Sequence, residues 1–231
     1  MKTALVIPAL NESECLRVLL PLVPADVRAV VVDNGSTDDT FTIATSLGAE
    51  CVWEPTRGYG TAVRRGLTHL TPAPPDIVAI MDADLSHSPR QLEALLEPLL
   101  SDRADMVLAD RTGLAEPGAL TVPQRLGNAL ATRLIAWHTG YRYRDMGPFR
   151  ALRWDALQRL QLQDPTWGWN VEMQMRAAQH RLRIEEISLP YRPRAAGVSK
   201  ISGTLIGSVR AGARILHSTH RYRETTHASH P

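Results

Sequence analysis

The sequence predicts a single, Rossmann-like α/β domain of three layers, in which helices cover both faces of a mainly parallel β-sheet. Short apolar runs alternate with helix-like segments between residues 4 and 111, and this alternation is typical of parallel sheets covered on both faces. Of the 231 residues, 44% are hydrophobic, which is enough for one large core. We expect the domain at residues 1–201, a basic amphipathic helix at 202–224 and a disordered tail at 225–231.

The expected elements follow one another regularly in the first half of the chain and less regularly in the second. The strand candidates are the apolar runs 4–7, 27–32, 50–54, 77–81, 106–109 and 184–189. The helix candidates, which carry apolar residues at helical spacing or lie between caps and turns, are at about 13–23, 40–47, 63–67, 89–100, 125–138, 154–160, 170–180 and 203–217. Residues 140–153 are rich in Arg, Tyr and Gly and carry no expected element.

The net charge of +2 conceals a basic C-terminal region. Between Arg192 and Arg223 there are seven Lys and Arg residues and no acidic residue. Such a region suggests an anionic partner, either a phosphate group or an acidic membrane surface. Nucleic acid is not expected as a partner, because aromatic residues make up only 5% of the chain and none alternates with the basic ones.

The cysteines and the apolar runs bear on the compartment. Cys15 and Cys51 stand in no metal-ligand spacing, so we expect reduced thiols and a cytoplasmic protein. Charges or prolines interrupt every apolar run before it reaches the length of a membrane span. The protein is therefore expected to be soluble or peripheral at the inner face of a membrane, and its oligomeric state is left open.

Acidic residues follow three of the predicted strands. Glu12 lies just beyond the first, Asp33 follows the second, and Asp82 and Asp84 follow the fourth. The carboxyl ends of parallel strands lie along one edge of the sheet, where ligands bind. A single carboxylate there suits a ribose hydroxyl or a base nitrogen, whereas the Asp-x-Asp pair suits a divalent cation that holds a diphosphate.

Each of these acids also has a simpler explanation. Asp82 and Asp84 could cap the next helix together with Ser86 or Ser88. Asp33 begins an Asp-Asn-Gly sequence that forms turns readily without any ligand. The placement of all of them along one predicted edge favours a binding site.

Taken together, the motifs of the chain resemble a known family. They are Ile7-Pro8-Ala9-Leu10-Asn11-Glu12, Val32 to Asp38, Arg57-Gly58-Tyr59-Gly60, Asp82 to His87, Asp145 to Arg150 and Gly197-Val198-Ser199-Lys200. In this order, the sequence resembles a family-2 glycosyltransferase of the GT-A fold. It is most similar to the branch of dolichol-phosphate and polyprenol-phosphate mannosyl and glucosyl synthases, over nearly the whole chain to about residue 205.

The resemblance implies a donor site for a nucleotide sugar. Its nucleoside-binding residues would be Pro8, Leu10, Glu12 and Asp33, with Arg57 close by. Asp82, Ala83 and Asp84 would hold the diphosphate through Mg²⁺ or Mn²⁺, with Asp82 and Asp84 as the metal aspartates and Asp84 as the direct ligand. Ser86 stands where the family often has Gln, so whether Ser86 or His87 completes the metal site is left open.

The resemblance also implies catalytic groups in the second half. Arg111 and Arg125 match two arginines that bind the donor diphosphate or an acceptor phosphate, and Lys200 belongs to a loop that closes over the donor. Asp145 is the candidate general base if the acceptor is a hydroxyl, whereas a phosphate acceptor needs none. Glu172 is either a cap-region carboxylate or a second acid of the acceptor site.

The expected reaction is the inverting transfer of a hexose from a UDP-glucose or GDP-mannose type of donor to a polyprenyl or dolichyl phosphate. A soluble hydroxyl acceptor is the alternative within the same chemistry. A nucleotidyltransferase and a non-catalytic nucleotide-sugar-binding protein are the alternatives of other classes. A dinucleotide-binding Rossmann protein is disfavoured, because Gly-x-Gly-x-x-Gly is missing after the first strand.

Overall fold

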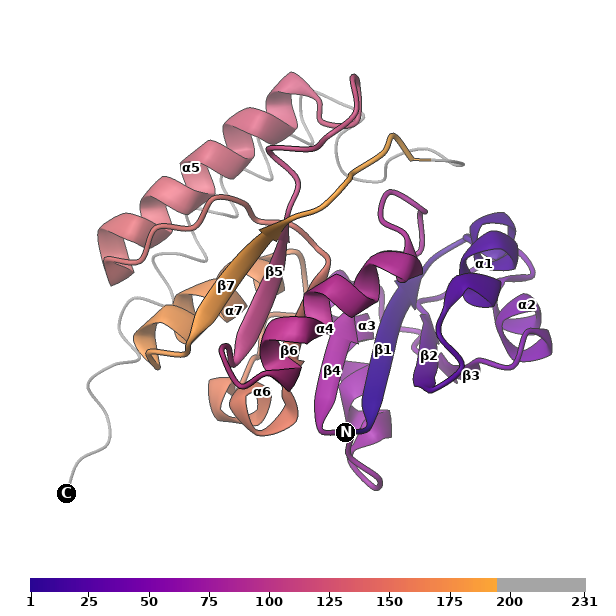
Figure 1. Cartoon of the computed structure of the whole chain (residues 1–231). Helices are drawn as coiled ribbons and strands as arrows, with labels where there is room; N and C mark the ends of the chain where they lie inside the picture. Colours follow the sequence, from indigo (N-terminus) through magenta and orange to yellow (C-terminus); the bar gives the residue numbers. More distant parts are fainter. Residues whose placement is uncertain (195–231) are drawn as a thin grey trace.

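The domain is built on a seven-stranded sheet with the strand order β3-β2-β1-β4-β6-β5-β7 (Figure 1). The computed structural model describes residues 1–194. The strands are β1 (Thr3–Ala9), β2 (Val27–Asp33), β3 (Glu50–Trp53), β4 (Ile77–Ile80), β5 (Met106–Asp110), β6 (Arg150–Arg153) and β7 (Ile184–Ser188). The predicted fold class, a single α/β domain with a mostly parallel sheet, is confirmed.

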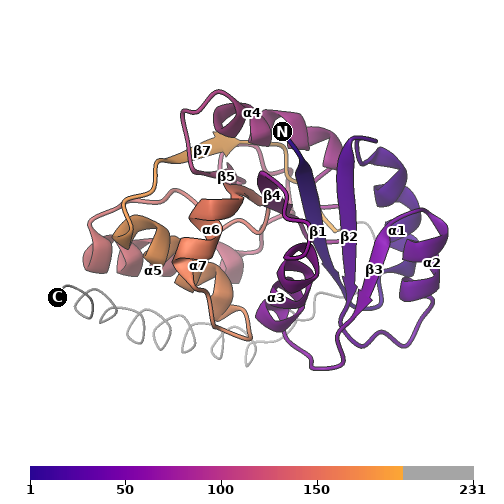
Figure 2. The ribbon, with the colours of Figure 1, turned by 90° about the horizontal axis from the view of Figure 1, so that it is seen from below.

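Helices cover both faces of this sheet (Figure 2). They are α1 (Ser13–Leu19), α2 (Thr40–Ser46), α3 (Tyr59–Leu70), α4 (Leu92–Leu100), α5 (Val122–Thr139), α6 (Trp154–Leu160) and α7 (Gly168–Gln179), with short 3₁₀ turns at Leu20–Leu22 and Pro89–Gln91. One buried apolar cluster joins the sheet to α3, α5, α6 and α7, and the other joins it to α1, α2 and α4. Successive strand residues contribute to opposite clusters, as the pleat requires.

The parallel strands bring the ends of the first half together at one edge. β1 pairs in parallel with β2 on one side and with β4 on the other. Backbone bonds extend this pairing beyond the strands, from Asn34 N to Ala9 O (2.8 Å) and from Met81 N to Val6 O (3.1 Å). The loops that follow β1, β2 and β4 therefore leave the sheet side by side.

Strand β6 was not expected from the sequence. It is antiparallel to both β4 and β5 and is inserted between them. The strand has four residues with Arg at each end, and the side chain of Arg150 is fully buried, so it shows neither an apolar run nor an alternating pattern. Because β6 runs in the opposite direction, its beginning lies at the edge where the parallel strands end. Residues 144–149 reach that edge in this way.

The first helix begins without a side-chain cap. Asn and Ser often cap helices, and Asn11 and Ser13 are both close by, but Glu12 occupies the cap position and makes no side-chain cap bond. Asn11 instead accepts a hydrogen bond from Thr37 N (2.7 Å), which ties the loop after β1 to the loop after β2.

The predicted helix 202–224 and tail 225–231 lie outside the described residues. Within residues 1–194, no helix is both long and apolar enough to cross a bilayer.

Candidate active site

The loops after β1 and β2 form one end of the site. Asp33 is 1% exposed, and its Oδ1 accepts a hydrogen bond from Ser36 N (2.8 Å), so the carboxylate shapes the turn. Glu12 is also buried, and its backbone N donates to Thr40 Oγ1 (2.9 Å). Pro8, near the end of β1, and Leu10, directly after it, are half-buried. The structure thus brings these four predicted nucleoside-binding residues to neighbouring strand ends.

Arg57 is connected to this end of the site through the turn that follows β2. Asn34 Oδ1 accepts a hydrogen bond from Gly58 N (2.8 Å), and Arg57 Nη2 donates to Gly35 O (3.1 Å). A side chain at Gly60 would place its Cβ 1.9 Å from the carbonyl oxygen of Asp164. The Arg-Gly-Tyr-Gly sequence is therefore explained by the close crossing of the loop before α7 over the start of α3. Arg57 itself is exposed beside the turn of β2.

The Asp82-Ala83-Asp84 sequence follows β4, and Ser88 rather than either aspartate caps the next turn. The Ser88 hydroxyl accepts a hydrogen bond from Arg90 N. The side chain of Gln91 accepts one from Ser88 N, and the two bonds form a capping box. Asp84 Oδ1 accepts from Ser86 N (3.0 Å), which leaves its other oxygen toward the site. Leu85 between them has φ 63°, a left-handed conformation that bulky residues adopt rarely and that recurs at functional sites.

Asp82 and Asp84 form a concentration of negative charge. Burial and, to a smaller extent, the neighbouring Asp84 carboxylate together raise the pKa of Asp82 to about 7. A divalent cation would relieve this repulsion, and carboxylate oxygens are the ligands that Mg²⁺ and Mn²⁺ prefer. Among the described residues no group of three or more His, Cys, Asp or Glu side chains could enclose a metal. In charge and donor type, the pair of Asp82 and Asp84 fits such a cation.

His87 lies in the interior of the loop. Its Nδ1 is 3.2 Å from Gln91 Oε1, and its ring packs against Phe149 and Tyr191 at centroid distances of 5.2 and 5.0 Å. Burial lowers the pKa of His87 to about 4, so the ring is neutral. Its contacts support the loop, and Ser86 beside it is likewise buried.

Arg111 and Asp145 form a buried, bidentate ion pair. Arg111 Nε donates to Asp145 Oδ2 (2.7 Å), Arg111 Nη2 donates to Oδ1 (2.9 Å), and the backbone N of Arg111 also donates to Oδ2 (2.9 Å). Asp145 is 1% exposed, and the Arg111 guanidinium holds its pKa below the usual value although burial opposes this. The guanidinium also lies over the Tyr191 ring, with Cζ 5.2 Å from its centroid. A carboxylate held in this way is a poor proton acceptor.

The other candidates of the second half have different surroundings. Arg125 is exposed on the first turn of α5, where its Nε donates to Leu120 O (3.3 Å). Glu172 is fully buried, and its Oε2 accepts from the backbone N of Gln163 (2.9 Å) and of Asp164 (2.7 Å). Glu172 therefore holds the loop before α7. Lys200 and its loop lie outside the described residues.

Two arginines at the site were not among the sequence candidates. Arg194 forms an ion pair with Glu12, and its Nη1 is 4.0 Å from Asp84 Oδ2. The sequence feature that could have identified Arg194 is its position in a basic loop shortly after the expected strand 184–189. Arg150 is fully buried on β6, its Nη2 donates to Gly147 O, and its charge acts on Asp82. Arg150 ends the Asp145 to Arg150 motif, but the motif gave it no role of its own, and a buried arginine on a strand is rarely expected.

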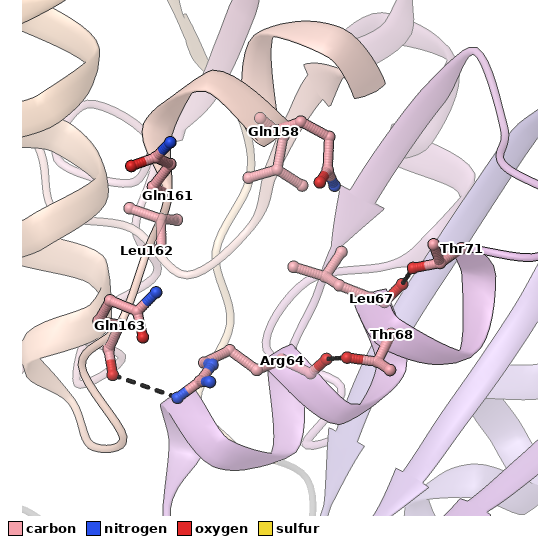
Figure 3. A pocket seen from close by; sticks show the side chains of 9 residues that line it. Arg64, Leu67, Thr68, Thr71, Gln158, Gln161, Leu162 and Gln163 are labelled. Atoms are coloured by element: carbon pink, nitrogen blue, oxygen red, sulfur yellow. Dashed lines mark hydrogen bonds between the residues drawn. The ribbon is translucent and has the colours of Figure 1, made fainter.

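A hollow of the described part of the chain lies away from these residues. It has a volume of about 320 Å³ and lies between α3 and the end of α6 (Figure 3). Arg64 spans it and donates from Nη1 to Gln163 O (3.3 Å). Its walls are glutamine, threonine and leucine side chains without a carboxylate. We therefore place the chemistry at the carboxyl edge of the sheet.

The fold and the acids at its edge define an α/β protein whose acidic side chains gather at the carboxyl ends of parallel strands. Residues 4–159 match glycosyl transferase family 2, and the chain belongs to this family. An uncharacterized glycosyltransferase of Mycobacterium tuberculosis is 39% identical over 88% of this chain and 91% of its own length. The resemblance inferred from the motifs is confirmed.

Two further relatives and a solved structure are named for specific reactions. A dolichyl-phosphate hexose transferase of Haloferax volcanii is 32% identical over 83% of both chains. An undecaprenyl-phosphate mannosyltransferase of Micrococcus luteus is 31% identical over 90% of both chains. The crystal structure of glucosyl-3-phosphoglycerate synthase from Mycobacterium tuberculosis with Mn²⁺, UDP-glucose and phosphoglyceric acid is similar with a TM-score of 0.71. It is 25% identical and covers 95% of this chain and 80% of its own.

Proposed function

We propose that this glycosyltransferase moves a hexose from a nucleotide sugar to the phosphate of a polyprenyl or dolichyl phosphate at a membrane surface, with inversion at the anomeric carbon. A phosphate oxygen of the acceptor forms the new bond to the anomeric carbon. The bond from that carbon to the donor diphosphate breaks, and the nucleoside diphosphate leaves with the electron pair. No proton has to be removed, because the acceptor phosphate is already ionised.

The state of Asp145 is the observation that carries this proposal. A hydroxyl acceptor requires a base within hydrogen-bond reach, and Asp145 was the candidate. Its two oxygens instead accept three hydrogen bonds from Arg111, and its pKa is lowered. We infer that Asp145 positions Arg111, whose guanidinium suits the bidentate binding of a phosphate. An anionic acceptor fits this arrangement better than a hydroxyl.

The donor end supports the first half of the reaction. Glu12 and Asp33 would bind the nucleoside, with Pro8 and Leu10 beside them and Arg57 at the adjacent turn. Asp84 and Asp82 would hold Mg²⁺ or Mn²⁺, which when bound neutralises charge on the departing diphosphate. A UDP-sugar is the first donor to test, since the solved neighbour contains UDP-glucose and Mn²⁺. A GDP-sugar stays an alternative.

The exposed face of α5 supports a lipid acceptor. Val122, Leu126 and Trp137 are 69%, 67% and 79% exposed on this helix, which runs along the outside of the domain (Figure 1). Residues 117–144 contain four arginines and no acidic residue, so apolar and cationic side chains share this region. That composition is typical of helices at anionic lipid surfaces.

Helix α5 is connected to the site through the side opposite its exposed apolar residues. Asn128 Oδ1 accepts from Met146 N (2.8 Å), next to Asp145. A lipid phosphate presented by a membrane under α5 would therefore approach the loop that holds Arg111. A small phosphorylated acceptor is the second candidate, because the solved neighbour binds phosphoglyceric acid.

The test is transfer of labelled sugar from UDP- and GDP-sugars, with Mn²⁺ or Mg²⁺, in two parallel arms. One arm contains vesicles with polyprenyl phosphate, and the other contains soluble phosphoglycerate. We expect label in the lipid phase, dependent on metal and abolished by Asp84→Asn. Label in the soluble product alone would replace the lipid acceptor by the second candidate, and release of diphosphate from a nucleoside triphosphate instead would overturn glycosyl transfer.

A further inference from the structure

The segment after β7 crosses the carboxyl edge of the sheet and is fixed there at several points. Tyr191 N donates to Leu114 O (3.3 Å), and Arg192 N donates to Ser86 O (3.0 Å). Gln91 Nε2 donates to Pro190 O (2.8 Å). These bonds join residues 190–192 to the loop after β5 on one side and to the loop after Asp84 on the other. Arg194 is thereby delivered to the donor end of the site.

Arg194 faces two carboxylates that come from different strand ends. Its Nη2 pairs with Glu12 Oε1, and its Nη1 is 4.0 Å from Asp84 Oδ2. The side chains of Arg194, Glu12 and Asp84 are 23%, 7% and 16% exposed. One guanidinium thus offsets the repulsion between a predicted nucleoside-binding acid and the predicted direct metal ligand.

We propose that Arg194 is an exchangeable counter-ion of the donor site. In the donor-free protein it neutralises Glu12 and Asp84. A divalent cation at Asp84 would lie within a few ångströms of the guanidinium and repel it, so the two compete for one carboxylate. When the nucleotide enters, Arg194 moves to its diphosphate, which a planar guanidinium binds through two parallel hydrogen bonds. This inference rests on the donor site proposed above.

The exchange has consequences of opposite sign for two ligands. Without Arg194, Mn²⁺ alone should bind several-fold more tightly, because a competing positive charge has been removed from Asp84. In the presence of Mn²⁺, UDP should bind about 10-fold more weakly, because charge-assisted hydrogen bonds to the diphosphate are lost. A residue that only shapes the loop would weaken both ligands together.

The experiment measures binding rather than turnover. Free Mn²⁺ is followed by electron paramagnetic resonance during titration of the full chain, and UDP binding in saturating Mn²⁺ is followed by calorimetry, with GDP in a parallel series. The variants are Arg194→Ala and Arg194→Gln, which remove the charge, and Arg194→Lys, which keeps it. Arg192→Ala is the matched control, because that side chain is 70% exposed and pairs with Glu116 instead (3.2 Å).

We expect tighter Mn²⁺ and weaker UDP or GDP binding in the Ala and Gln variants, with intermediate values for Lys and wild-type values for the Arg192 control. Unchanged or weaker Mn²⁺ binding in both neutral variants would overturn the exchange while leaving glycosyl transfer intact. Unchanged nucleotide binding in both neutral variants would overturn the movement of Arg194 to the diphosphate. Absence of Mn²⁺ and nucleotide binding in the wild type would overturn the donor site itself.

Discussion

The two ends of the site hold their carboxylates in different ways. At the proposed acceptor end, Asp145 is bound by Arg111 through two side-chain hydrogen bonds of 2.7 and 2.9 Å. At the proposed donor end, Asp84 has its nearest guanidinium atom, Arg194 Nη1, at 4.0 Å. The first arrangement fixes a cation in place, and the second leaves a carboxylate available to another ligand. We infer that the acceptor end is preorganised, whereas the donor end changes its charge pairing when it is filled.

The largest effect on transfer should come from substitution of Asp84, the carboxylate with the longer contact to an arginine. Asp84→Asn keeps the shape of the side chain but removes the charge that would hold the metal. Because a metal held there would stabilise the leaving group by about 3–4 kcal/mol, we expect transfer to fall about 100- to 1,000-fold. Initial rates at saturating donor measure this, together with Mn²⁺ affinity.

The control for Asp84 is Asp39→Asn, since Asp39 is exposed at the start of α2 and makes no side-chain cap bond. It should leave rate and Mn²⁺ affinity unchanged. Retention of metal-dependent transfer by the Asp84 variant would show that the metal is held elsewhere.

The ion pair between Arg111 and Asp145 should contribute to the stability of the folded protein. Asp145→Asn leaves the largely buried Arg111 without its ionic partner, and we expect a loss of about 3–5 kcal/mol in the free energy of unfolding. Urea titration measures it. A double-mutant cycle with Arg111→Gln should give losses in transfer rate that are far from additive. Additive losses with a new dependence of rate on pH would instead indicate that Asp145 is a base.

The same pair predicts a pH dependence of stability. The pKa of Asp145 is lower in the folded protein than in the unfolded chain, so its contribution is fully present above about pH 4, the ordinary pKa of aspartate. That contribution is lost as the pH falls through the folded pKa. The difference in unfolding free energy between wild type and Asp145→Asn should therefore shrink in acid, and a constant difference from pH 7 to pH 3 would contradict the ion pair as its source.

The exposed apolar residues of α5 should contribute to binding of the protein to a lipid surface. The double variant Leu126→Ser, Trp137→Ser should reduce binding to vesicles with anionic lipid about 10-fold or more, because each side chain loses a favourable transfer to the interface. Cosedimentation measures this. Val18→Ser, at a 54% exposed position on α1, is the control from the donor half. A change in oligomer mass without a change in vesicle binding would mean that the face contacts a second copy.

The smallest effect is expected at Arg125. Its side chain is exposed and bonds to Leu120 O within its own helix start. If it adds only electrostatic attraction for the acceptor phosphate, Arg125→Ala should raise the KM for the acceptor about 3-fold, as expected for an exposed ionic contact, and leave the KM for the donor unchanged. An equal rise in both KM values would place Arg125 at the donor instead.

The donor half could be predicted from the sequence because its chemistry follows regular strands. Glu12, Asp33 and Asp84 each come directly after an apolar run, so the parallel topology determines where they meet. The pairing of Arg111 with Asp145 could not be predicted, since it depends on β6. That strand is stabilised by its place between β4 and β5 rather than by an apolar pattern of its own. Arg194 was missed because its partners, Glu12 and Asp84, lie far from it in the sequence.

The inserted strand β6 also determines the order in which the sheet can be assembled. Strands β1 to β4 are adjacent in sequence and in space, so they can pair as soon as they are synthesised. β5 precedes β6 in the chain but cannot join the sheet until β6 has paired with β4. Until then the edge of β4 is open to other strands. The acceptor half therefore forms last, through contacts distant in sequence that fold slowly, and its early intermediates are the ones most exposed to misassociation.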